Sequence, residues 1–287
     1  MNIDRYRFSG EKKVKLSDFD TKHTDRFSSF EDVRSIVDRN IGELAELQSR
    51  LYAEGKTALL IIFQAMDAAG KDSAIKHVMS GVNPQGVNVH SFKQPSSKEL
   101  AHDYLWRVAK ALPERGKIAV FNRSYYEDVL VVKVHKLYEK LNVPDSCKTA
   151  HTIKQRYKQI RNFEDYLWEN GIVTVKFFLH LSKETQRKRF LKRIDQTDKN
   201  WKFSDSDLKE REYWDDYQEA YQSAIEATAT EENPWYIIPA DKKWFSRAVI
   251  SNIILEVMRE INPQYPAITH AQEAVLEESR RKLTGGE

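Results

Sequence analysis

The sequence has almost no cysteine and no long apolar run. Cys147 is its only cysteine, so an intramolecular disulfide and a cysteine zinc site are both excluded. No uncharged apolar run approaches the roughly 20 residues that a membrane-spanning helix needs. Residues 1–18 lack the apolar core of a secretory signal. We therefore expect a soluble, cytoplasmic protein with no membrane partner.

Neither sign of charge dominates the chain. Lysine and arginine number 46 and aspartate and glutamate 43, so the net charge says little about function. Apolar residues make up 40% of the 287 residues, enough for a sizeable core, which excludes a disordered protein. The basic residues are nevertheless clustered, in 133–161 and again in 183–193. This clustering predicts either a positive surface for an anionic ligand or ordinary solvated helix faces.

Short apolar runs alternate with amphipathic stretches along most of the chain. The apolar runs predict buried strands at 57–65, 87–92, 118–122, 172–181 and 235–238. The stretches at helical spacing predict helices at 29–53, 70–80, 98–112, 124–140, 150–170, from the N-cap Ser182 onward, 208–229 and 248–261. Such alternation is typical of one α/β domain, a parallel sheet with helices on both faces. The domain is expected to span 29–262, between a polar, irregular arm (1–28) and a loosely held tail (263–287), with a polar loop at 195–207.

The first predicted strand runs into a short loop and then a helix, which is where P-loop proteins bind phosphate. The match to G-x-x-x-x-G-K-[ST] is imperfect, because Ala65 replaces the first glycine and Asp72 stands where a Mg²⁺-binding serine or threonine is expected. Lys71 is still in place to reach across two phosphates. The predicted phosphate-binding loop comprises Ala68, Ala69, Gly70, Asp72 and Ser73. The alternative is a simple strand-to-helix turn with a solvated lysine.

Polar residues gather at the predicted carboxyl ends of the strands, where open parallel sheets bind ligands. Asp67 lies inside the phosphate loop, and it is either a Mg²⁺ ligand, an acid–base carboxylate or a brace for the loop. Asn122 ends the third strand as a neutral oxygen ligand, and Arg123 after it can neutralise a phosphoryl group in transfer. Glu127 lies one helical turn beyond Arg123, so it can form a salt bridge with that arginine or face an acceptor phosphate.

Two arginines mark the helix that follows the fourth strand. Arg189 and Arg193 are four residues apart and therefore share one face of that helix. Adenylate-kinase-like enzymes close an arginine-bearing lid over phosphates and so exclude water. The pattern predicts either such a lid or an exposed basic helix paired with the acidic residues beyond Asp205.

Five segments in register resemble the polyphosphate kinase 2 family. They are MDAAGKDSAIKHV, SGVNPQGVNVHSFKQPS with ELAHDYLWR, FNRSYYEDVLVVKVH, QRKRFLKRI with WKFSDSDLKEREYWDDY, and PWYIIPADKKWFSR, and they cover about residues 30–262. The resemblance implies a three-layer, thymidylate-kinase-like P-loop kinase fold of the α/β class with a helical lid at about 182–230. It also implies reversible transfer of phosphoryl groups between inorganic polyphosphate and adenine or guanine nucleotides, with Mg²⁺ or Mn²⁺ as cofactor.

Expected roles for individual residues follow from the same resemblance. Asp67 is expected to handle the metal and the acceptor phosphate. Lys71 and Arg123 are expected to grip the phosphoryl group, and Arg189 and Arg193 to act from the lid. The expected metal ligands are Asp67, Asn122 and Glu127. The expected acceptor-nucleotide residues are Asn83, Gln85, Phe92, Lys93 and Glu127, and the expected polyphosphate-channel residues are Lys76, Lys133 and Lys136.

The motif Asn-Arg-Ser-x-Tyr-Glu-Asp at 122–128 resembles the branch of the family that phosphorylates both nucleoside monophosphates and diphosphates. We also expect a homo-oligomer, either a dimer or a tetramer.

Two alternative functions stay open. An ATP-dependent nucleoside monophosphate kinase would want a serine or threonine after Lys71 and a carboxylate at position 122. A non-catalytic polyanion-binding or RNA-binding protein would not need Asp67, Lys71 and Arg123 to converge. Nucleic acid is not an expected partner, because the aromatic strand pattern and GXXG loop of RNA-binding modules are missing.

Overall fold

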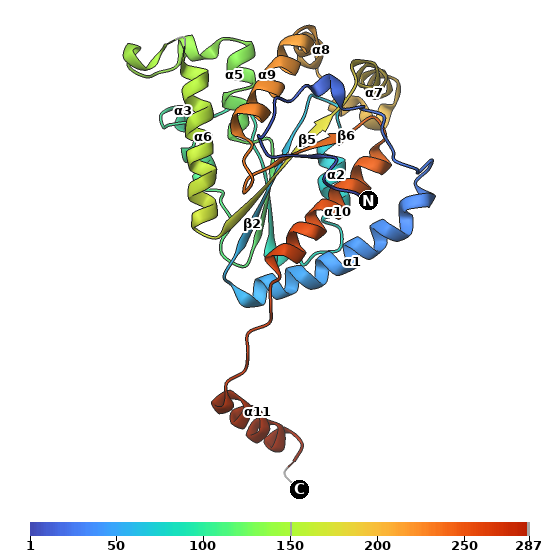
Figure 1. The fold of residues 1–287 in the computed structure, drawn as a ribbon, viewed down its shortest axis with the longest axis vertical. Helices are drawn as coiled ribbons and strands as arrows, with labels where there is room; N and C mark the ends of the chain where they lie inside the picture. Colours follow the sequence, from blue (N-terminus) through green and yellow to red (C-terminus); the bar gives the residue numbers. More distant parts are fainter. Residues whose placement is uncertain (150, 286–287) are drawn as a thin grey trace.

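A six-stranded sheet forms the centre of the molecule in the computed structural model, which describes residues 1–149 and 151–285 (Figure 1). The strand order is β1-β6-β5-β2-β4-β3. Strands β2 to β6 run parallel to one another, and the short β1 pairs antiparallel with β6 at one edge. The strands are β1 (Arg7–Phe8), β2 (Ala58–Gln64), β3 (Val87–Ser91), β4 (Ile118–Asn122), β5 (Ile172–His180) and β6 (Trp235–Pro239). The prediction of a mostly parallel α/β sheet is confirmed.

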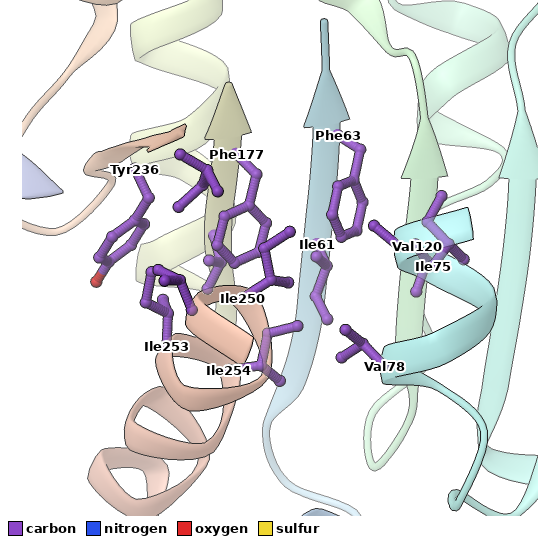
Figure 2. Close-up of a cluster of buried hydrophobic side chains, with 14 of the residues drawn as sticks. Ile61, Phe63, Ile75, Val78, Val120, Phe177, Tyr236, Ile250, Ile253 and Ile254 are labelled. Atoms are coloured by element: carbon purple, nitrogen blue, oxygen red, sulfur yellow. The ribbon is translucent and has the colours of Figure 1, made fainter. Parts of the chain in front are cut away.

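Helices cover both faces of this sheet. On one face lie α1 (Glu31–Glu54), α2 (Lys71–Val78) and α10 (Lys243–Ile261), and on the other lie α6 (Thr152–Glu169) and α9 (Trp214–Thr228). Strand β2 is buried along its whole length, which explains its nearly continuous apolar sequence. Side chains alternate along it: Ile61 and Phe63 pack against α2 and α10 (Figure 2), whereas Leu60 and Ile62 pack on the opposite face. The predicted three-layer architecture is therefore confirmed.

Strand register places the two strand ends that matter most next to each other. In the β2–β4 pair, Phe63 is the partner of Asn122, so the loop that follows β2 starts beside the residue that ends β4. The backbone N–H of Arg123 also donates to the carbonyl of Phe63, at 3.0 Å. The phosphate loop and Arg123 therefore start from one rigid edge of the sheet.

Three predicted helices are broken in the structure. The stretch 98–112 forms two short helices, because the Asp103 side chain accepts from the N–H of Leu105 and starts a new turn. The stretch 124–140 is interrupted where Lys136 adopts a left-handed conformation, with φ of 52°. The first stretch forms α3 (Ser97–Leu100) and α4 (Trp106–Ala109), and the second forms η3 (Tyr125–Asp128), α5 (Val131–Val134) and η4 (Leu137–Lys140). The predicted 208–229 helix is divided between α8 (Asp205–Glu212) and α9, and the expected 195–207 loop contains η6 (Thr197–Lys202). The predicted 150–170 helix corresponds to α6, and its predicted first residue, Ala150, lies outside the described residues.

Both ends of the chain are more ordered than the sequence suggests. Within the expected irregular arm, Tyr6, Val14 and Leu16 are buried in the core, and β1 extends the sheet. The expected loose tail contains α11 (His270–Leu283), an exposed helix that stands away from the domain in Figure 1. The other short elements are η1 (Leu16–Asp18), η2 (Pro84–Gly86), η5 (Asp145–Cys147) and α7 (Lys183–Asp195), which Ser182 caps as predicted. Within 1–149 and 151–285, the structure has no helix with the length and apolarity needed to span a bilayer.

Candidate active site

The phosphate loop joins β2 to α2 and has an unusual backbone. Gly70, the N-cap of α2, has φ of 107°, a conformation that side chains rarely adopt. Ala68 is also left-handed, with φ of 61°, which is strained for a residue that carries a Cβ. Such backbone strain persists only where surrounding contacts hold it, and it is concentrated at functional sites. The loop is therefore a shaped structure rather than a simple turn.

Lys71 points back under this loop. Its Nζ donates to the carbonyl of Ala65 at 3.0 Å, and the residue is buried. Burial lowers the pKa of Lys71, and the nearby Arg123 guanidinium lowers it further, whereas Asp67 acts in the opposite direction. A cation buried next to another cation is poised to accept an anionic ligand, because a phosphate offsets both charges.

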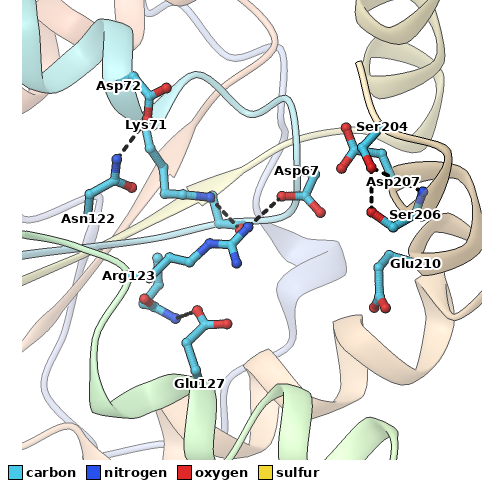
Figure 3. A network of polar contacts seen from close by, with 12 residues as sticks. Asp67, Lys71, Asp72, Asn122, Arg123, Glu127, Ser204, Ser206, Asp207 and Glu210 are labelled. Atoms are coloured by element: carbon cyan, nitrogen blue, oxygen red, sulfur yellow. Dashed lines mark hydrogen bonds and ion pairs between the residues drawn. The ribbon is translucent and has the colours of Figure 1, made fainter. Parts of the chain in front are cut away.

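Arg123 forms an ion pair with Asp67 across the loop. Its Nη2 donates to Asp67 Oδ1 at 3.0 Å (Figure 3), and its backbone is left-handed, with φ of 66°. The alternative of an Arg123–Glu127 salt bridge is wrong, because Glu127 instead accepts from Gln64 Nε2 at 2.9 Å. Glu127 is nevertheless the main cause of the raised pKa of Arg123. Arg123 is thus held between two carboxylates, in contact with only one of them.

The three expected metal ligands are not assembled as a set. Asn122 donates from its amide to Asp72 at 2.7 Å, while Asp67 faces Arg123 and Glu127 faces Gln64 (Figure 3). Over residues 1–149 and 151–285, no three His, Cys, Asp or Glu side chains are grouped so that they could hold an ion. Mg²⁺, however, is usually bound by one or two carboxylates together with waters and substrate phosphates. The loop carboxylate of Asp67 fits that kind of site.

The predicted lid arginines have different surroundings. Arg193 pairs with Asp207 of α8 at 2.9 Å, which links α7 to the next helix. The guanidinium of Arg189 donates to four backbone carbonyls, those of Ala68 (2.9 Å), Ala69 (2.7 Å), Ala240 (2.7 Å) and Asp241 (3.1 Å). Burial lowers the pKa of Arg189 to about 10. The alternative of an exposed basic helix does not describe Arg189, and the expectation that it grips phosphate from a lid does not account for these four bonds.

A cavity of about 710 Å³ opens above the loop. Its lining includes ten cationic side chains and the carboxylates of Asp67 and Asp72. The cationic side chains are those of Lys71, Lys76, Lys93, Arg123, Arg189, Lys192, Arg193, Lys199, Lys202 and Lys243. Such a concentration of positive charge focuses the electrostatic field and attracts anions into the cavity.

The other predicted binding residues divide into two groups. Phe92 and Lys93 line the cavity, as does Lys76 of the expected channel. Asn83, Gln85 and Glu127 do not, and Asn83 serves as the cap of η2 by accepting from the N–H of Gln85. Lys133 and Lys136 also lie outside it. Lys133 donates to Glu219 and to Ser223, at 3.1 and 3.2 Å, so it ties α5 to α9.

Sequence reasoning missed several lysines of the cavity. Lys199 and Lys202 belong to a stretch that was expected to be a plain polar loop, and Lys192 was one of many charges on a basic helix. Lys243 starts α10, just beyond the carboxyl end of β6. Its position after a strand end was a usable signal, because that edge of the sheet is where ligands bind. The polyphosphate channel stays a prediction: Lys76 lines this cavity, whereas Lys133 and Lys136 do not, since charge density in the sequence does not show which way a side chain faces.

These features define the class of protein. A parallel sheet covered on both faces, a phosphate loop ahead of α2, and cationic residues around it are the parts of a P-loop-type kinase. The chain belongs to the polyphosphate kinase 2 family, whose model matches residues 30–266.

Relatives support this assignment over the whole length. The chain is 48% identical to an ADP-polyphosphate phosphotransferase from Rhodopseudomonas palustris, an alignment that covers 97% of each protein. It is 43% identical to an AMP/ADP-polyphosphate phosphotransferase from Meiothermus ruber, over 96% of this chain and 99% of that one. The crystal structure of polyphosphate kinase 2 from Arthrobacter aurescens superimposes with a TM-score of 0.86 at 37% identity, covering 96% of both chains.

Proposed function

We propose that the protein transfers phosphoryl groups from inorganic polyphosphate to nucleoside monophosphates and diphosphates, converting AMP to ADP and ADP to ATP. The observation that carries this proposal is the cavity, which combines a phosphate loop with ten cationic side chains and two carboxylates. A nucleotide alone does not require so much positive charge, whereas polyphosphate carries about one charge per phosphate along a chain. Binding such a chain releases counterions, as binding of other polyanions does.

Phosphoryl transfer mainly requires that the reacting groups are positioned and that the charge of the phosphates is neutralised, and the cavity residues suit both tasks. Lys71 and Arg123 neutralise the phosphoryl group that moves, since both lie at the loop and both line the cavity. Arg123 is already oriented by its bond to Asp67. Lys192, Lys199, Lys202 and Lys243 bind the donor chain, and Lys243 reaches the loop itself at Gly70.

Phosphotransferases of this kind generally need a divalent metal, and we infer that it is Mg²⁺ or Mn²⁺. Asp67 would hold it together with substrate phosphates, since its carboxylate lines the cavity. Arg123 bonds to Oδ1 of this carboxylate, so Oδ2 is the oxygen that would face the ion. When bound, the ion supplies positive charge to the phosphate oxygens. Asp72 and Asn122, which are hydrogen-bonded to each other at 2.7 Å and both line the cavity, would supply further oxygen atoms near such an ion.

The acceptor range rests on two observations. The strand-end motif with Asn122 and Glu127 is the one that resembles the branch acting on both monophosphates and diphosphates. The relatives include both an AMP/ADP-polyphosphate and an ADP-polyphosphate phosphotransferase. Phe92 and Lys93 border the acceptor side, where an aromatic ring and a cation suit a base and a phosphate. Adenine and guanine nucleotides are both expected acceptors.

The test uses the purified chain with polyphosphate and Mg²⁺ but no ATP. AMP and ADP are supplied separately, and the products are separated by ion-exchange chromatography. We expect ADP and then ATP from AMP, and ATP from ADP. A parallel reaction with ATP and AMP but no polyphosphate measures an ATP-dependent monophosphate kinase, and we expect no turnover there. Turnover only in that parallel reaction would overturn the proposal, and turnover of ADP alone would restrict it to diphosphates.

A further inference from the structure

Three successive carbonyls of the phosphate loop are held from the same helix. Gln186 Nε2 donates to the carbonyl of Asp67 at 3.0 Å, and Arg189 donates to the carbonyls of Ala68 and Ala69. Residues 186 and 189 are three apart on α7 and therefore lie on one face of the helix. These bonds draw the carbonyl side of the loop towards α7.

The amide groups of the loop consequently point the other way. In a planar trans peptide the N–H and the C=O point in opposite directions, so a carbonyl fixed towards α7 turns the following N–H away from it. The N–H groups of Ala68 and Gly70 follow the fixed carbonyls of Asp67 and Ala69. Among the described residues, neither of these two N–H groups donates to a protein acceptor. They are the free donors that a phosphate would need.

Gln186 is bonded on its other side to α8, the second helix of the expected lid. Its Oε1 accepts from Nη1 of Arg211 at 2.8 Å, and the same nitrogen donates to the carbonyl of Lys183. Arg211 belongs to α8, the helix that Asp207 also ties to Arg193. Gln186 itself is only 2% exposed, so its amide has no freedom to exchange these partners for water. One buried side chain thus connects α8 to the backbone of Asp67.

We propose that Gln186 is a positioning residue that couples the position of α8 to the shape of the phosphate loop. With Arg211 docked, Gln186 holds its amide in the one orientation that presents Nε2 to Asp67, and the loop keeps its N–H groups turned towards the cavity. When α8 moves away, Arg211 releases Oε1, the Gln186 amide is free to rotate, and Asp67 loses its backbone anchor. The N–H of Ala68 is then held towards the cavity only while α8 is in place, which limits transfer to water when the site is open. Arg189 provides the constant part of the anchor, since its other bonds go to Ala240 and Asp241 rather than to α8.

The main test variant is Gln186→Glu, because it keeps the length of the side chain and an acceptor for Arg211 but replaces the donor to Asp67. This inference rests on the proposed function only for its kinetic readout, so a second readout is independent of turnover. That readout is hydrogen exchange of the Ala69 backbone N–H, which donates to the carbonyl of Met66 at 3.3 Å, measured on the protein without substrates. The matched control is Arg187→Gln, since the neighbouring Arg187 is exposed and, within the described part of the chain, bonds only to Glu184.

We expect the Ala69 amide to exchange at least about tenfold faster in Gln186→Glu than in the wild type. We expect kcat to fall by roughly 10- to 100-fold, the loss typical of a misplaced reacting group. The KM for nucleotide should change less than about threefold, because no residue that binds the nucleotide has been removed. Arg211→Gln should show the same pattern more weakly. Adding it to Gln186→Glu should cause little further loss, because both changes break one relay. The control should match the wild type in both measurements.

Three results would overturn the proposal. The first is exchange of the Ala69 amide in Gln186→Glu equal to that of the wild type. The second is a loss of kcat that only follows a loss of folded protein. The third is an Arg211→Gln effect that simply multiplies with that of Gln186→Glu. If Gln186→Glu does not fold, Arg211→Gln alone decides, since its side chain is partly exposed. If the wild type transfers nothing from polyphosphate, the proposed function fails, while the exchange data still accept or reject the coupling.

Discussion

Replacing Asp67 with asparagine separates catalysis from stability in this protein. The substitution removes one negative charge and keeps the shape of the side chain. In the structure it weakens a single contact, the 3.0 Å pair with Arg123, whose side chains are 28% and 41% exposed. A pair exposed to that degree contributes at most about 1 kcal/mol to folding. For a domain of this size, such a loss lowers Tm by about 2–4 °C.

The expected effect on turnover is much larger. Loss of a metal-binding or acid–base carboxylate typically costs about 10²–10⁴ in rate, which corresponds to roughly 2.7–5.4 kcal/mol of transition-state stabilisation. A destabilisation of about 1 kcal/mol leaves a domain of ordinary stability almost wholly folded, so unfolding cannot produce that loss. The two magnitudes differ enough to be told apart in one set of measurements.

The assay follows ATP formed from ADP and polyphosphate at saturating Mg²⁺, alongside a thermal melt of the same preparation. Glu231→Gln is the matched control, because it breaks a comparable ion pair with Arg7 at 2.7 Å, well outside the active-site cavity. The control should keep full turnover with a similarly small shift in Tm. If Asp67→Asn retained more than about a tenth of the wild-type kcat, the assignment of that carboxylate to the reaction would be refuted.

Three further predictions concern charge in the cavity and in the core. Raising the salt concentration should increase the KM for polyphosphate more steeply than the KM for ADP, because the longer anion displaces more counterions; equal slopes in log–log plots would contradict the cavity as its binding site. Burial and the neighbouring cation Arg189 lower the pKa of Lys243 to about 8, so this lysine loses its charge as the pH rises through that value. The KM for polyphosphate should therefore rise between about pH 7.5 and 9, and Lys243→Arg, which stays charged, should flatten that rise. The buried pair Lys176–Glu164, at 2.6 Å with side chains 0% and 1% exposed, lies away from the cavity. Lys176→Met should destabilise the protein by about 3–5 kcal/mol, because Glu164 is left buried without a counter-charge; a melt within about 2 °C of the wild type would show that the pair is dispensable.

The sequence by itself determined the parallel strands β2 to β6 and the place of the phosphate loop, but not the edge strand β1. A short, nearly all-apolar run such as that of β2 is typical of a strand buried on both faces of a parallel sheet, so the strand could be inferred without knowing its neighbours. The phosphate loop could be predicted because a strand, a run of small residues and then Lys71 follow one another in the chain, and this local pattern is typical of such loops. The family membership could be identified for the same reason, since it rests on segments of residues that are adjacent in the chain.

Tertiary structure alone decided which partners these residues have. The sequence spacing of Arg123 and Glu127 allowed a salt bridge, but the left-handed backbone at Arg123 turns its side chain towards Asp67 instead. Arg189 was predicted to reach for phosphate, and it bonds to the backbone of two loops that are far apart in sequence. Periodicity gives the face of a helix on which a side chain lies, but it does not give the element packed against that face. The contacts of Gln186, which join α7, α8 and the phosphate loop, exist only because the packing of the whole domain brings those three segments together.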